Sequence, residues 1–92
     1  MSHTVRQQAK LLNRIRRIRG QIDAIERALQ SAAACEQVMH RIAGARGALD
    51  GLLGEVVDEH IRSHLVEPLK GSNAEAAAAA EELADVFRSY LK

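Results

Sequence analysis

One cysteine and a pair of histidines are the residues of this sequence best suited to chemistry. The chain contains a single cysteine, Cys35, and two of its four histidines, His60 and His64, lie four positions apart. At this spacing two side chains project from the same face of a helix, where their imidazoles can share a metal ion. A soft thiolate together with two imidazoles suits a transition metal.

Cys35 belongs to the same helical face as the histidine pair. With about 100° between successive residues, its side chain points within about 20° of both imidazoles, yet it lies about 37 Å from His60 along a continuous helix. Two antiparallel copies that cross near residues 48 to 50 would place Cys35 of one copy beside both histidines of the other, twice by symmetry. The spacing therefore predicts a metal site shared between two chains.

A fourth ligand is available from His3, near the start of the chain. Mixed nitrogen and sulfur ligation, completed by an N-terminal nitrogen or water, fits Ni(II) or Co(II), and Zn(II), Cu(I) and Cu(II) also accept these donors. Cys35 has two other interpretations. It is either a small buried hydrophobic residue, or a nucleophile whose thiolate attacks a small electrophile that a nearby amine then crosslinks, without any metal.

Basic residues are concentrated at the start of the chain. The first 20 residues contain six lysines and arginines and no acidic residue, whereas the remainder carries seven basic and twelve acidic side chains. Four of the six follow one another at helical spacing and form the basic strip, which consists of Arg6, Lys10, Arg14 and Arg17. Cations on a rigid helix neutralise the phosphates of double-stranded DNA. The predicted DNA contacts are Lys10, Arg14, Arg16, Arg17 and Arg19.

The sequence shows no helix-turn-helix pattern, zinc-finger spacing or set of stacking aromatic residues. Recognition of DNA would therefore depend on backbone contacts and duplex shape. The competing interpretation is a helical adaptor that binds no DNA and whose basic strip is merely solvated. A membrane surface is a weaker candidate partner, because the apolar stripe of the first helix is too narrow to enter lipid.

Two long helices and a shorter one must position these residues. Apolar residues repeat at steps of four and three from Leu11 to Leu29, which predicts a first helix with a narrow apolar seam. The pattern resumes in a second helix from about Ala32 to Val66, which Pro68 stops. At about 50 Å, this rod exceeds the diameter of a compact monomer of this size and needs a partner chain.

A third helix is predicted after Gly71. Ser72, followed by Glu75 three residues later, has the spacing of a capping box. The apolar face expected to dock this helix consists of Leu83, Val86, Phe87, Tyr90 and Leu91. Within the second helix, glycines at positions 44, 47, 51 and 54 form a stripe that would let a second helix backbone approach closely.

The composition fits one all-α domain that spans residues 1–92. Aromatic residues make up only 2% of the chain, so the core must be built from Leu, Ile, Val and Ala, which pack most readily as helices. The sequence has no run of about 18 apolar residues and no apolar leader, and we expect a cytoplasmic protein without membrane contact. It also lacks an acid–base constellation, which argues against an enzyme.

Several segments together resemble the CsoR/RcnR/FrmR family of bacterial repressors. They are RIRRIRGQIDAIERAL at 14–29, Cys35, RIAGARGALDGLLGEVVDEHIRSHL at 41–65 and the ending RSYLK. The resemblance implies an all-helical antiparallel dimer that pairs into a tetramer. It also implies a repressor that binds operator DNA without ligand and releases the DNA when an effector occupies the inter-subunit site.

The effector differs between branches of this family. The start MSHT, with His3, and the residues Cys35, His60 and His64 are similar to the nickel/cobalt branch. The copper branch has Cys where this chain has His64. The formaldehyde branch starts Met-Pro and joins the N-terminal nitrogen to the cysteine through a methylene. In this chain Ser2 stands where the formaldehyde branch has proline, although the segment RIRRIRGQ is more similar to the formaldehyde branch. We therefore predict Ni(II) or Co(II) as the effector, with formaldehyde at Ser2 and Cys35 as the alternative.

Overall fold

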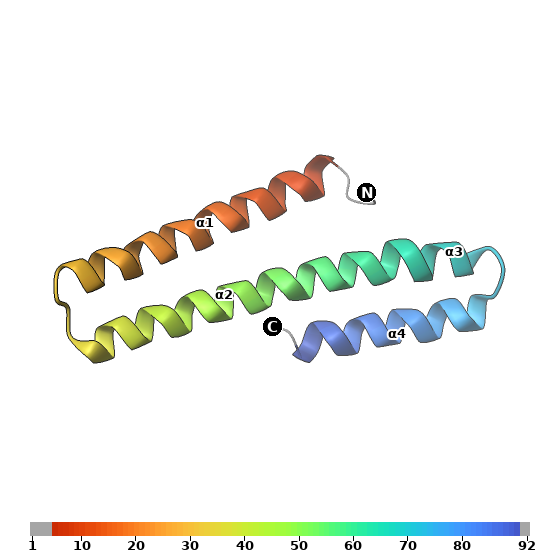
Figure 1. Ribbon diagram of the computed structural model, residues 1–92. Helices are drawn as coiled ribbons and strands as arrows, with labels where there is room; N and C mark the ends of the chain where they lie inside the picture. Colours follow the sequence, from red (N-terminus) through yellow and green to blue (C-terminus); the bar gives the residue numbers. More distant parts are fainter. Residues whose placement is uncertain (1–4, 91–92) are drawn as a thin grey trace.

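Three helical rods make up the computed structural model, which describes residues 5–90. They are α1 (Val5–Gln30), a continuous rod of α2 (Cys35–Ile61), η1 (Arg62–Val66) and α3 (Glu67–Lys70), and finally α4 (Ala74–Tyr90). The molecule measures 59 × 26 × 12 Å. Figure 1 shows α1 and α4 running back along the central rod, one from each of its ends. The predicted all-α fold with three helices and a very long second one is confirmed.

The connection between α1 and α2 places Cys35 at the start of α2. The amide of Ala33 donates to the carbonyl of Ala28 and that of Ala32 to Leu29, the hydrogen-bond pattern that commonly closes a helix. Ala32 adopts a positive φ of 56°. Because this left-handed residue ends α1, the second helix begins at Cys35, three residues after its predicted start.

The predicted stop at Pro68 is wrong, because the rod continues to Lys70. Proline has no amide hydrogen, and its ring crowds the carbonyl four residues earlier, here that of His64. The helix accommodates Pro68 by widening into the π-helical turn η1 just before it, where the amide of Glu67 donates to the carbonyl of Arg62. The widened turn carries His64.

The cap of α4 also differs from the prediction. The side chain of Asn73, not of Ser72, accepts a hydrogen bond from the amide of Ala76 at 3.1 Å. Asn73 is therefore the N-cap residue, one position later than predicted.

Small residues dock α4 onto the central rod. Ala77, Ala80 and Ala84 are buried, at steps of three and four that place them on one face. The prediction that Leu83, Val86, Phe87 and Tyr90 dock this helix is wrong, because these four side chains are exposed. Leu91 lies outside the described residues. Alanine lets two helices approach closely, and so the larger residues point away from the rod.

Much apolar surface remains uncovered in the single chain. Along α2 the exposed residues are Met39, Ile42, Leu49, Leu53 and Val56. Exposed apolar residues gathered on one helix mark interaction surfaces. None of the helices within residues 5–90 is long and apolar enough to span a membrane.

Candidate functional site

His60 and His64 lie side by side where α2 passes into η1. Their ring centroids are 4.5 Å apart and the ring planes are inclined by 33°. Both residues are exposed. The two imidazoles are thus close enough to bind one metal ion through one nitrogen each.

Cys35 is a free, exposed thiol at the other end of α2. Since α2 is an unbroken helix of 27 residues, the thiol lies about 37 Å from His60. Within residues 5–90, no three His, Cys, Asp or Glu side chains gather where they could hold a metal ion. The single chain therefore keeps the thiol apart from the histidines, and it does not bury Cys35 as a small hydrophobic residue. Ser2 and His3 lie outside the described residues.

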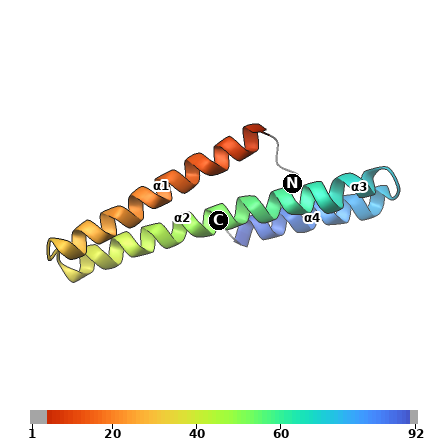
Figure 2. The ribbon, with the colours of Figure 1, turned by 45° about the horizontal axis from the view of Figure 1, so that its top comes forward.

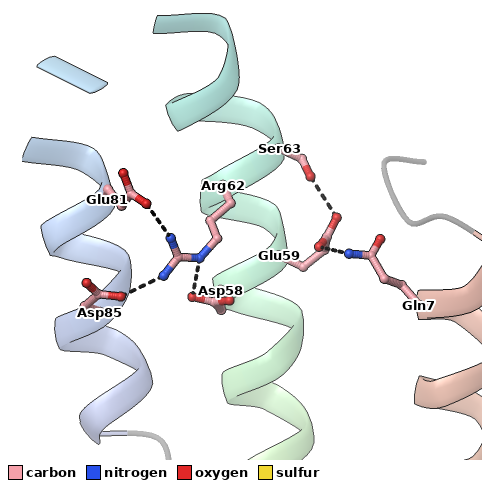
Figure 3. A network of polar contacts seen from close by, with 7 residues as sticks. All are labelled: Gln7, Asp58, Glu59, Arg62, Ser63, Glu81 and Asp85. Carbon is pink, nitrogen blue, oxygen red and sulfur yellow. Dashed lines mark hydrogen bonds and ion pairs between the residues drawn. The ribbon is translucent and has the colours of Figure 1, made fainter. Parts of the chain in front are cut away.

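Arg62 ties α4 to the rod beside the histidines. Its Nε donates to Asp58 at 3.0 Å, Nη2 to Asp85 at 2.7 Å and Nη1 to Glu81 at 3.4 Å (Figure 3). The hydrogen bond to Asp85 is the main cause that raises the pKa of Arg62, with Asp58 adding to it and burial opposing it. Three carboxylates from two elements thus hold one guanidinium.

Glu59 makes a second set of contacts, toward α1. Its carboxylate accepts a hydrogen bond from Gln7 Nε2 at 2.8 Å and one from Ser63 Oγ at 2.7 Å (Figure 3). Glu59 therefore connects α1 with the π-helical turn that carries His64. Neither Arg62 nor Glu59 was predicted from the sequence. The spacing of Asp58–Arg62 and Glu59–Ser63 could have indicated the local pairs, but not the partners on α1 and α4.

Replacing Arg62 should loosen α4. We expect Arg62→Met to lower the free energy of unfolding by about 1 kcal/mol, a value that allows for the solvent around a half-exposed ion-pair network. Urea unfolding measures the loss, and faster amide exchange in α4 locates it. The control is Lys70→Met, because the Lys70–Glu67 ion pair lies within one exposed turn. Equal losses for the two variants would show that Arg62 does not anchor α4.

The structure divides the predicted DNA contacts into two groups. Lys10, Arg16, Arg17 and Arg19 are exposed, and Arg16 donates to Asn13 Oδ1 at 2.9 Å. Arg14 instead turns toward α2, where its Nη1 pairs with Glu55 Oε1. Four of the five cations are therefore presented to solvent, while the fifth is occupied within the chain.

A groove of about 390 Å³ separates α1 from α2 at this point, and Gly47, Gly51 and Gly54 lie on its α2 side. Figure 2 shows α1 diverging from α2 toward its N-terminal end. The glycine stripe thus faces α1, and the guanidinium of Arg14 lies against Gly51. Side chains at Gly44 and Gly47 would meet open space, so no helix of residues 5–90 packs its backbone against that part of the stripe.

Comparison with known proteins decides the family. Residues 7–89 match the family described as metal-sensitive transcriptional repressor. The chain belongs to the metal-sensitive transcriptional repressors. This family is one of repressors and not of enzymes, and DNA binding follows from that role. The resemblance to the CsoR/RcnR/FrmR family is therefore confirmed.

Two relatives of this metal-sensitive repressor cover its full length. A Serratia marcescens protein described as an uncharacterized protein in the bioA 5′ region is 46% identical over 92 residues, the whole of both chains. The transcriptional repressor RcnR of Salmonella arizonae is 36% identical over 92 residues, again the whole of both chains. The similarity to a named repressor thus extends from end to end.

Proposed function

We propose that this protein represses transcription by binding operator DNA and releases it when Ni(II) or Co(II) binds between two subunits. Each metal site consists of Cys35 from one copy and His60 and His64 from the other, with His3 as a further ligand. The observation that carries the proposal is the pair of adjacent imidazoles at one end of a straight rod whose other end holds an exposed thiol. The donor set matches the nickel/cobalt branch of the family.

The exposed apolar face of α2 supports the antiparallel pairing of two chains. Leu49 and Leu53 are about half exposed and lie near the middle of the rod. A crossing at residues 48 to 50 would bury Leu49 against Leu49 of the second copy, with Leu53 one turn from the crossing, and bring each thiol to the partner's histidines. The exposed face of α4 offers a second surface, through which dimers would pair into the tetramer that the family resemblance implies.

The basic side of α1 supplies the contacts to DNA. Lys10, Arg16, Arg17 and Arg19 are all exposed on α1. Lys10 and Arg17 belong to the basic strip and can follow a row of phosphates, while Arg16 and Arg19 flank the apolar seam on its other side. Metal that ties His3 to the helix-pair interface would change the spacing between the basic strips of two subunits. By linkage, metal then lowers the affinity for DNA by the same factor by which DNA lowers the affinity for metal.

An effector titration tests this function. Purified repressor is bound to a fluorescein-labelled duplex from its own promoter region, and fluorescence anisotropy follows the addition of Ni(II), Co(II), Zn(II) or formaldehyde. We expect Ni(II) or Co(II) to release the DNA, with a coupling of about 5- to 150-fold in affinity. Binding that persists at saturating metal would contradict the proposal, and the absence of any salt-dependent duplex binding would favour the helical adaptor.

Formaldehyde is the second candidate effector, because the Cys35 thiol is exposed. The thiolate would add to the carbonyl carbon to give a hydroxymethyl thioether. In a chain from which Met1 has been removed, the free amine of Ser2 would then displace the hydroxyl, which leaves as water, and an S–CH₂–N link would form. Mass spectrometry after formaldehyde treatment distinguishes this reaction from metal binding, because only the reaction adds one carbon to the chain.

A further inference from the structure

We propose that Glu55 competes with DNA phosphate for the guanidinium of Arg14, so that an ion pair within the chain weakens DNA binding. This inference rests on the proposed repressor function and concerns its regulation. It identifies Glu55 and Gly51, which lie on α2 and not on the basic strip, as residues that determine DNA affinity.

Two residues of α2 form the site, here called the seat, in which the guanidinium of Arg14 lies. Arg14 Nη1 pairs with Glu55 Oε1, and the two side chains are 31% and 38% exposed. Gly51, one turn before Glu55, leaves the space for the guanidinium, because a Cβ atom at this position would lie 2.7 Å from Arg14 Nη2. The charge of Glu55 thus holds the Arg14 side chain, and the missing side chain of Gly51 leaves the room for it.

Arg14 differs in this respect from the rest of the basic strip. Within residues 5–90 no carboxylate lies within ion-pair distance of Lys10 or Arg17. Those cations are available to phosphate, whereas the Nη1 donor of Arg14 is already occupied.

Carboxylate and phosphate compete for a guanidinium through the same chemistry. Both accept paired hydrogen bonds from its fork of N–H groups. A DNA phosphate that engages Arg14 must therefore displace Glu55 or share the guanidinium with it. The partly exposed position of the pair makes this exchange accessible, since such ion pairs change an equilibrium only about two- to fivefold.

Two substitutions should release the Arg14 guanidinium from Glu55 by different means. Glu55→Gln removes the charge and keeps the shape, while Gly51→Ala blocks the seat and favours the helix. We expect each to bind a labelled mixed-sequence duplex about two- to fivefold more tightly than wild type, the fold-change typical of a partly exposed ion pair. The slope of log affinity against log salt should steepen by about 0.9, the value for one more phosphate contact.

Controls separate this effect from a general change of charge. Asp50→Asn removes one negative charge from an exposed site on α2 and should tighten binding less than Glu55→Gln. Arg17→Ala should make the salt slope shallower by about 0.9, as the loss of one phosphate contact requires. In an Arg14→Gln background, Glu55→Gln should add nothing beyond the effect of Asp50→Asn. Circular dichroism confirms that each variant is folded.

The inference and the proposed function fail in different ways. If wild type binds duplex DNA with a clear salt slope but Glu55→Gln binds equally or more weakly, Glu55 orients Arg14 rather than competing for it. That result overturns the inference alone. The inference also fails if Asp50→Asn raises the DNA affinity as much as Glu55→Gln does, or if Glu55→Gln raises it undiminished in the Arg14→Gln background. If wild type shows no salt-dependent binding, the proposed function and the inference fall together.

Discussion

Chains carrying Cys35→Ala and chains carrying His64→Leu should restore each other's metal binding when they are unfolded and refolded together. Each variant alone should lose more than about 100-fold in Ni(II) affinity, because even loss of an outer-shell partner costs about 10- to 100-fold. In a mixed dimer, the intact Cys35 of one chain faces the intact histidines of the other. The second site of that dimer lacks both groups.

The expected recovery follows from random pairing. Half of the dimers in an equimolar mixture are mixed, and each regains one of its two sites, so about a quarter of the wild-type sites should bind Ni(II) tightly. Isothermal titration calorimetry measures this fraction. A site built within one chain would give no recovery, because neither chain holds all of its ligands.

The histidine outside the proposed site provides the matched control. His40 is exposed on α2 and has no assigned role. His40→Leu should bind Ni(II) as wild type does. If it loses affinity as severely as His64→Leu, the assignment of ligands is wrong.

Leu49→Glu should break the protein into monomers and thereby abolish metal binding. Leu49 is 49% exposed in the single chain, so a carboxylate there is solvated and the helices persist. In an antiparallel dimer that crosses at residues 48 to 50, the two new carboxylates are buried against each other, which costs several kcal/mol. We expect the dimerisation constant to fall by at least about 10³-fold.

Analytical ultracentrifugation checks the oligomeric state, and circular dichroism checks that the helices remain. The control Ala78→Glu places the same carboxylate on an exposed position of α4, on the side that carries Glu82 and Asp85 rather than Leu83 and Val86. It should leave the oligomeric state unchanged. A dimeric Leu49→Glu protein with full metal affinity would exclude the proposed crossing.

Local periodicity determined much of this fold. The steps of three and four that place Leu11 to Leu29 on one seam and His60 beside His64 depend only on the geometry of a helix. The length of the central rod also follows from such local patterns. The predicted stop at Pro68 was wrong, because a helix can widen by one residue to accommodate the missing amide of a proline. No local preference in the sequence shows whether a given helix will widen in this way.

Contacts between helices were decided only by the tertiary structure. The sequence by itself determined that Arg14 lies on a basic strip and that Arg62 has an acidic neighbour one turn earlier. Whether Arg14 faces solvent or Glu55, and whether α4 docks through its alanines or its larger residues, depends on the rotation and spacing of one helix relative to another. These quantities arise from the packing of all three rods together, and no interval along a single helix encodes them.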